Sequence, residues 1–422
     1  MALPTTGDET PRYRVVVLLM LLLVYTFNFI DRQIVGILAI PIKADLALSD
    51  TQLGLMGGLA FALFYTFLGI PIAMLADRAN RTTIMTVALV AWSAMTACCG
   101  LAQNFGQLFA ARLGVGVGEA GGVAPAYSLV ADYFPSEQRA RALGVYSFGI
   151  PIGGALGIFF GGLIASLIDW RTAFIAVGIA GIVLAPLFKW VVKEPPRGRY
   201  DVAGGTRQPA SLREVMRVLG AKRSFWGLSL GASASSMMGY GLFFWLPSFF
   251  VRSHGLTLLQ ASLYFAAILL IGGLAGIWLG GWSADRFGRG RRRAYALIPA
   301  AAFITTLPFY VAAVTTSSLV LSFCLFIVPT ALGLVWLGPV LSAIQHVVPS
   351  GMRATASAVF LFINNLVGIG LGSVALGALS DALSARYGAD SLRYAILAGT
   401  VFYLVAATLF VISARRLERD WQ

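Results

Sequence analysis

The stretch GGWSADRFGRGRRR, residues 280–293, decides the fold, because an earlier part of the chain repeats its plan. AMLADRANRTT, residues 73–83, also ends a long apolar run with an Asp-Arg pair and further basic residues. A second echo follows in the same order, since PSEQRARALG at residues 135–144 corresponds to PSGMRATASA at residues 349–358. Two repeated loops in the same order indicate that the chain consists of two similar halves.

The composition is typical of an integral membrane protein. Of the 422 residues, 58% are hydrophobic and 12% are charged, and the mean hydropathy is +0.81. Soluble domains contain about one half apolar and one quarter charged residues. Because about 20 apolar residues span a bilayer, the apolar runs predict twelve transmembrane helices, at residues 14–40, 51–76, 82–102, 105–133, 140–167, 171–193, 224–251, 258–284, 294–314, 317–347, 354–381 and 392–414.

The net charge of +13 follows from the placement of basic residues in loops, and it requires no nucleic acid as a partner. Most of the 31 Lys and Arg residues lie in the two tails and the even-numbered loops. Since basic residues favour the cytoplasmic side, we expect both termini to be cytoplasmic. Short loops and termini suggest a bacterial inner-membrane protein. The opposite side holds only Lys43, Arg171, Arg252, Arg386 and Arg393.

Residues 1–193 and 224–422 are predicted to form two six-helix bundles, and the polar residues 194–223 to form a linker. Within the linker, Ser211-x-x-Glu214 has capping-box spacing. A short interfacial helix and an unstructured loop are both compatible with this segment, since ten residues make a marginal helix. One face of that helix would be apolar, with Leu212, Val215, Met216 and Leu219.

Four ionisable residues lie well inside the predicted spans: Asp31 and Arg32 in the first, and Arg112 and Glu119 in the fourth. Each costs about 2.5–3.5 kcal/mol at a helix centre, so each must face a partner or a watery cavity. Adjacent residues on a helix do not face each other. We therefore expect pairs between the two helices, most simply Asp31 with Arg112 and Arg32 with Glu119, while the reverse pairing stays open.

The glycines of RLGVGVGEAGG, residues 112–122, include the Gly-x-Gly-x-x-Gly spacing of dinucleotide-binding domains. That spacing binds phosphate only where a strand turns into a helix, and here it lies within an apolar span. Gly114, Gly118 and Gly122 instead recur every four residues, which lets another helix approach closely. The glycines therefore predict helix packing.

We interpret the four charges as a protonation switch, with Asp31 and Glu119 as the proton-coupling residues. The fully charged set is neutral, and protonating either carboxylate leaves an excess positive charge that can hold an anionic head group. The alternative is an ion-pair clip that fastens the first span to the fourth, although a buried pair is a poor source of stability.

The second half has no charged residue well inside its spans, so its part of the substrate cavity is expected to be apolar and aromatic. Such a cavity suits an amphiphile with an anionic head and a hydrocarbon tail. For the aromatic and methionine positions, packing or lipid contact is the alternative. The residues expected to contact substrate are Asn28, Arg32, Arg112, Met237, Tyr240, Phe244, Trp336 and Asn364.

The repeated loops are expected to form a cytoplasmic gate that latches the outward-facing state through pairs across helix ends. Anchoring by positive charge alone would explain the arginines but not the repeated aspartates. The predicted gate residues are Asp77, Arg78, Arg81, Asp132 and Arg139 in the first half and Asp285, Arg286 and Arg289 in the second.

These motifs resemble the major facilitator superfamily over the whole chain. GWSADRFGR, residues 281–289, matches the loop signature of that family, and the first copy departs from it at Ala73 and Asn80, where glycines are usual. The resemblance implies an all-α membrane fold, in which twelve helices form two pseudo-symmetric bundles. Parallel repeats of this kind place a substrate site between the halves near the membrane midplane.

More narrowly, three stretches resemble the spinster-type transporters: NFIDR at residues 28–32, RLGVGVGEA at residues 112–120, and SLVADYFPSEQRARALGVYSFGIPIGGALG at residues 128–157. This resemblance implies a sphingolipid, sphingosine phosphate or lysolipid-like cargo. NFIDR alone is shared with anion:cation symporters. A proton-coupled symporter of small organic anions such as sugar acids is therefore the alternative.

The sequence offers little to an enzyme or a channel. His254 and His346 lie at span ends, and the three cysteines, Cys98, Cys99 and Cys324, lack metal-ligand or nucleophile spacing. No phosphate-binding loop is present. We expect a monomeric secondary transporter without metal or cofactor, driven by a proton gradient.

Overall fold

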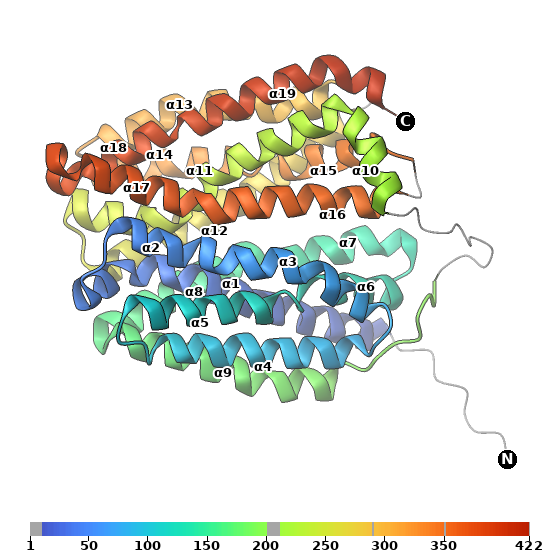
Figure 1. Cartoon of the computed structure of the whole chain (residues 1–422), viewed down its shortest axis with the longest axis horizontal. Helices are drawn as coiled ribbons and strands as arrows, with labels where there is room; N and C mark the ends of the chain where they lie inside the picture. The colour runs from blue at the N-terminus through green and yellow to red at the C-terminus, as the bar shows by residue number, and fades with distance from the viewer. Residues whose placement is uncertain (1–10, 201–211, 289–290, 350–351, 422) are drawn as a thin grey trace.

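The computed structural model describes residues 11–200, 212–288, 291–349 and 352–421. These residues are helical apart from short turns, and the helices run along one long axis (Figure 1). Ten of the helical stretches are long and apolar enough to cross a membrane, and one of these, Thr355–Asp420, holds two passes. With the interrupted fourth pass, the described residues make twelve passes, so the predicted all-α fold is confirmed.

The first six passes form the N-terminal bundle, drawn in blue to green in Figure 1. In chain order they are α1 (Pro11–Leu46), α2 (Asp50–Gly57) with α3 (Leu59–Ala76), α4 (Arg81–Cys99), α5 (Phe105–Glu119) with α6 (Val123–Tyr133), α7 (Ser136–Ser147) with α8 (Gly149–Leu167), and α9 (Trp170–Val191).

After the linker helix α10 (Leu212–Ala221), six further passes form the C-terminal bundle. They are α11 (Arg223–His254), α12 (Leu258–Phe287), α13 (Ala294–Thr315), α14 (Leu319–Leu332) with α15 (Leu337–His346), α16 (Arg353–Asn364) continuing through the π-helix η2 (Asn365–Ile369) into α17 (Gly370–Tyr387), and α18 (Ser391–Gly399) with α19 (Val401–Asp420), after the 3-10 turn η3 (Gly388–Asp390).

Local caps fix where several helices begin. Ser49 and Gln52 form a capping box at the start of α2. Asn80 accepts a hydrogen bond from the main-chain N–H of Thr83 at 2.8 Å and so caps α4. The asparagine that departs from the family's loop signature therefore supplies a helix cap.

The fourth pass is not the continuous helix that its apolar run predicts. Helix α5 ends at Glu119, and α6 begins at Val123 after a short turn. Pro125, in the first turn of α6, has no N–H to donate to the preceding turn, and two glycines with weak helix preference precede it. The break leaves the Glu119 side chain at the end of α5, inside the bundle.

Two of the three predicted glycines, Gly114 and Gly118, pack α5 against α4, whereas Gly122 lies in the turn after α5 ends. A Cβ atom at Gly118 would lie 2.5 Å from the main-chain nitrogen of Trp92, and one at Gly114 would lie 2.5 Å from the Met95 side chain. Glycine is therefore required for α4 and α5 to approach this closely.

The two halves pack against each other through α2 on α17, α8 on α12, and α1 on α11. Helix α1 begins and α19 ends at the same end of the molecule (Figure 1). We call this end the terminus side and the opposite end the far side.

The linker contains the predicted short helix, α10, which packs on α11 and α16. Val215 and Leu219 are buried, whereas Leu212 and Met216 are exposed. Half of the predicted apolar face therefore contacts protein and half remains open. Ser211, the predicted cap, lies outside the described residues.

Candidate functional site

The four intramembrane charges lie together between α1 and α5. Arg32 donates from Nε to Oε2 of Glu119 at 2.7 Å, which is one of the two predicted pairs. Arg112 bonds to the other predicted partner, Asp31, but to its main chain: Nη1 of Arg112 donates to the Asp31 carbonyl oxygen at 3.4 Å. The Asp31 carboxyl lies instead beside the Trp92 indole of α4.

The expected side-chain pair between Asp31 and Arg112 is therefore not formed. Asp31 Oδ1 has no hydrogen-bond partner among the described residues. The reason is geometric: α1 turns the Asp31 carboxyl toward α4, while its carbonyl faces the guanidinium on α5. Asp31, Arg112 and Glu119 are each at most 1% exposed.

The surroundings of Arg32 combine a carboxylate with several aromatic rings. Its guanidinium lies 5.0 Å from the ring centre of Phe29, 4.7 Å from Phe61 and 4.6 Å from Tyr65. Planar guanidinium groups stack favourably on aromatic faces. One carboxylate and three rings thus fix the orientation of Arg32.

A cavity of about 110 Å³ lies between the halves. Its described lining contains no charged side chain, which agrees with the apolar and aromatic cavity expected of the second half. Phe29, Gln33 and Pro151 line it from the N-terminal half. Its main polar and aromatic side chains from the C-terminal half are Ser235, Ser236, Tyr240, Phe243, Tyr310, Thr330, Trp336 and Tyr403.

A smaller cavity of about 30 Å³ contains the cationic side chains Arg32 and Arg112. It shares Gln33, Tyr240 and Phe243 with the larger cavity, so the two are neighbours. We call the smaller one the cationic niche and the larger one the aromatic cavity. Together they offer positive charge at one end and uncharged, largely apolar surface at the other.

Of the predicted contact residues, Arg32, Arg112, Tyr240, Phe244 and Trp336 line one of these two cavities. The structure does not place the other three there. Asn28 lines a separate pocket inside the N-terminal half. Asn364 accepts a hydrogen bond from Ser236 Oγ at 2.9 Å within the C-terminal half, and Met237 is absent from both linings.

Several lining residues were missed from the sequence: Gln33 and the hydroxyl-bearing Tyr310, Thr330 and Tyr403. Each places a polar atom in an otherwise apolar span, which is a weak signal for a cavity. The sequence could not show which face of each span turns inward, and this information decides the lining.

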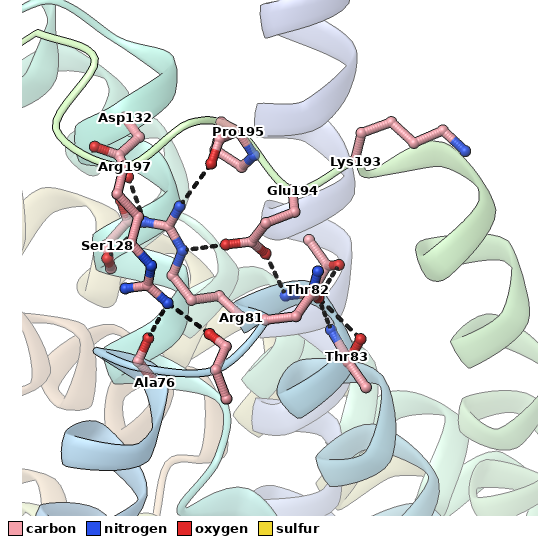
Figure 2. A network of polar contacts seen from close by, with 12 residues as sticks. Ala76, Arg81, Thr82, Thr83, Ser128, Asp132, Lys193, Glu194, Pro195 and Arg197 are labelled. Carbon is pink, nitrogen blue, oxygen red and sulfur yellow. Dashed lines mark hydrogen bonds and ion pairs between the residues drawn. The ribbon is translucent and has the colours of Figure 1, made fainter.

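On the terminus side, Arg81 is the centre of a buried network (Figure 2). Its Nε donates to Glu194 Oε1 at 2.7 Å, its Nη2 donates to the Pro195 carbonyl at 3.1 Å, and its Nη1 donates to the Asp132 carboxylate. Figure 2 shows the guanidinium between these groups. Arg81 therefore ties the start of the linker to α4 and α6.

A second arginine continues this attachment. Arg197 donates from Nη2 to the main-chain oxygens of Ala76 and Ala79, at 2.8 and 2.5 Å. These oxygens belong to the end of α3 and the loop after it. These hydrogen bonds thus hold the linker from Glu194 to Arg197 against the terminus side of the N-terminal half.

The predicted latch between the halves is not formed by the described residues in this conformation. Arg81 and Asp132 pair within the N-terminal half, and Arg139 donates to the Ala131 carbonyl at 2.8 Å. Three other predicted gate residues, Asp77, Arg78 and Arg286, are exposed. The side chain of Asp285 and the whole of Arg289 lie outside the described residues.

Among the described residues, the charged contacts between the halves lie on the far side, and the sequence did not predict them. Arg252 of α11 donates to both carboxylate oxygens of Asp50 at 2.6 Å, and Lys43, which lies in the same half as Asp50, donates to it at 2.5 Å. Asp381 of α17 accepts from the Thr51 main-chain N–H at 2.7 Å. A carboxylate of one half thus caps a helix of the other, which joins the two halves at the far side.

The profile of the Major Facilitator Superfamily matches residues 21–373. The chain belongs to this superfamily. A solved structure of a bacterial homologue of the human lysosomal transporter Spinster, in an inward-facing and unoccupied conformation, is 33% identical to it. That structure superimposes with a TM-score of 0.90 and covers 98% of this chain and 99% of its own. The predicted spinster resemblance is confirmed.

Two curated relatives agree with this family. An MFS-type efflux pump of Mycolicibacterium smegmatis is 34% identical, covering 95% of this chain and 92% of the relative. A hexuronate transporter of Bacillus subtilis is 32% identical over 64% of each chain. The protein is a multi-pass membrane transporter of spinster type and not an enzyme. Within the described residues of this spinster-type transporter, no group of three or more His, Cys, Asp or Glu could hold a metal ion.

Proposed function

We propose that this spinster-type transporter moves an anionic, lipid-like amphiphile across the membrane by alternating access, coupled to protons. One observation carries the proposal: the cationic niche with Arg32 and Arg112 adjoins an aromatic cavity whose described lining is uncharged. An anionic head group would lie in the niche, and an apolar chain would lie in the aromatic cavity. A sphingoid phosphate or a lysolipid has this shape and charge.

The pairing of Arg32 with Glu119 supports proton coupling. In the ionised state, the guanidinium is neutralised by the carboxylate 2.7 Å away. Protonating Glu119 would leave Arg32 available to an anion, and protonating Asp31 would add to the positive excess. Release of the proton would restore the internal pair and weaken the hold on the anion.

In this proposal the terminus side faces the cytoplasm, and the membrane is the bacterial inner membrane. The far side is closed by Asp50, Arg252 and Asp381 in this conformation. The terminus-side gate residues, among them Asp77 and Arg78, would pair across the halves once the far side opens. A proton gradient supplies the driving force, and no cofactor takes part.

A second candidate is a proton-coupled symporter of small organic anions such as sugar acids. The similarity to a hexuronate transporter favours it, and so does the NFIDR element. Such a cargo would use the cationic niche and would leave the apolar surface around Trp336 without a partner. For this reason we place the amphiphile first.

The test uses proteoliposomes with an imposed pH gradient and a fluorescent lysophospholipid as cargo. We expect gradient-dependent movement by the wild type and a loss of about a hundredfold or more in Glu119→Gln, the size expected when a positioned acid-base group is removed. Glu418→Gln is the matched control, because Glu418 pairs with Arg293 at an exposed position. It should transport like the wild type.

Each failure has a different meaning. Hexuronate uptake without lipid movement would replace the amphiphile by a small anion. Lipid movement by the wild type that ignores the pH gradient would remove proton coupling while leaving the cargo in place. Equal loss of transport and of folded protein in Glu119→Gln would identify the charge cluster as a structural clip.

A further inference from the structure

Glu119 presents its two oxygens to different surroundings. Oε2 accepts from Arg32, which lines the cationic niche. Oε1 has no hydrogen-bond partner among the described residues. The amide of Asn28, one turn before Arg32 on α1, lies beside the Glu119 carboxyl. The carboxyl therefore has a substrate face at Arg32 and a second face at Asn28.

The second face adjoins a pocket of about 10 Å³ inside the N-terminal half, which we call the inner pocket. Tyr25, Asn28, Met85, Trp92 and Tyr146 contribute to its lining. It shares no lining residue with the cationic niche or the aromatic cavity. A route through the inner pocket is thus separate from the route of the substrate.

The position of the inner pocket points to the terminus side. Helices α1 and α4 both start at that side, and Tyr25 and Met85 precede Asn28 and Trp92 along them. Tyr146 lies near the end of α7, a helix that also starts on the terminus side. The inner pocket therefore lies between Glu119 and the terminus side.

Buried polar groups at the inner pocket lack partners in the described part of the protein and can bind a water molecule. Both the amide nitrogen and the amide oxygen of Asn28 have no hydrogen-bond partner among the described residues, and Trp92, whose indole lies beside the Asp31 carboxyl, contributes to the pocket wall. These residues are 2% and 0% exposed. Buried polar groups are normally paired with protein or with ordered water, and the space suffices for about one water molecule.

We propose that a water molecule held by Asn28 in the inner pocket carries the proton between Glu119 and the terminus side. This inference rests on the proposed proton coupling. The water gives a proton to Glu119 Oε1 and takes one from the aqueous phase of the terminus side, so no charge remains on it. Deprotonation runs the same transfers in reverse. Asn28 is then a positioning residue for proton exchange, and the substrate does not touch it.

The charged groups that face Glu119 belong to two helices. Arg32 and Asp31 approach from α1, and Arg112 approaches from its own helix, α5. Helix α4 contributes the neutral Trp92 to the inner pocket. Changing Asn28 therefore leaves the charges around the carboxyl intact, which makes Asn28 a better probe of the route than Arg32 or Asp31.

The test compares Asn28→Leu, which keeps the shape but removes the polar groups, with Asn28→Ser, which keeps a polar group. Two modes of transport of a fluorescent lysophospholipid are measured in proteoliposomes: transport driven by a pH gradient, and exchange at equal pH between labelled and unlabelled lysophospholipid. Exchange requires substrate binding and alternating access but no net release of the proton from Glu119. It therefore reports folding and cargo binding separately from the proton route.

We expect Asn28→Leu to lower gradient-driven transport by about tenfold, as for loss of a positioned proton donor, while exchange stays near the wild-type rate. Asn28→Ser should retain both modes. Equal gradient-driven transport in wild type and Asn28→Leu would overturn the inference and leave the proposed function standing. Parallel loss of both modes would show that Asn28 acts on structure or cargo. A wild type without gradient dependence would overturn the proposed function itself.

Discussion

Arg32 does more than supply a positive charge, because three rings and a carboxylate fix the plane of its guanidinium. Phe29 and Tyr65 lie at 5.0 and 4.6 Å from that group, and Glu119 holds its Nε. A planar donor in a fixed orientation recognises phosphate or carboxylate through two parallel hydrogen bonds. A lysine at this position would keep the charge and lose the fixed geometry.

We predict that Arg32→Lys weakens binding of an anionic amphiphile by about tenfold, since a guanidinium and an ammonium are not interchangeable at a stacked site. The dissociation constant of a lysophospholipid, measured at one fixed pH on purified protein, checks this. Arg415→Lys, at an exposed position of α19, should bind like the wild type. Equal affinity in Arg32→Lys would mean that charge alone determines recognition.

At this scale the sequence predicted the charge cluster, because the cost of burying four charges in a membrane forces them together. It also predicted the pairing of Arg32 with Glu119. It could not predict that Arg112 would bond to the Asp31 main chain. Main-chain carbonyls compete with side-chain acceptors for the guanidinium, and the rotation of each helix about its axis decides which acceptor lies within reach. The same missing rotation explains why Asn28, Met237 and Asn364 were expected at the cavity.

Helix α5 owes its place in the bundle to small residues on one face and a break at its end. Gly118 lets the α4 main chain approach, and a turn after Glu119 separates α5 from α6. The glycine spacing predicted the first feature. The break was missed, because a continuous apolar run carries no turn signal and the interruption depends on three residues around Gly122.

We predict that Gly118→Ala destabilises the protein, because its Cβ would lie 2.5 Å from the Trp92 main-chain nitrogen. Overpacking of this kind costs about 1–3 kcal/mol. Gly144→Ala is the matched control, since its Cβ meets no atom within 4 Å on helix α7, and it should be neutral or slightly stabilising. Thermal unfolding in detergent measures both. An unchanged Tm for Gly118→Ala would show that α4 moves aside at little cost.

At the scale of the whole molecule, the two ends differ in which parts of the chain their polar contacts connect. The far side joins the halves through Asp50, Arg252 and Asp381, whereas the terminus side ties the linker to the N-terminal half through Arg81. The repeated loops predicted two halves and their similarity. They could not predict which end is closed, because one sequence serves both conformations of an alternating-access protein.

The far-side contacts nevertheless left a trace in the sequence. Lys43 and Arg252 are among the few basic residues assigned to that side, and Asp50 begins the second pass. A rare charge on a side poor in charge needs a reason. Lys43 pairs with Asp50 within the N-terminal half, and Arg252 pairs with Asp50 between the halves. The partner of Arg252 cannot be read from the sequence, since 202 positions separate Asp50 from Arg252.

We predict that Arg252→Gln shifts the population toward a conformation that is open on the far side. Asp50 is 2% exposed, and removing one partner of such a hydrogen-bonded pair costs about 2–5 kcal/mol, which is at least a tenfold change in the equilibrium between conformations.

Spin labels at the exposed positions Ala44 and Ala385, one in each half, report the far-side distance by pulsed electron resonance. Arg393→Gln is the control, because Arg393 pairs with Asp390 within one half. A longer distance in Arg252→Gln alone would show that the ion pair holds the far side closed. An unchanged distance would assign the closure to the packing of α2 on α17, where Gly54 already brings the two main chains together.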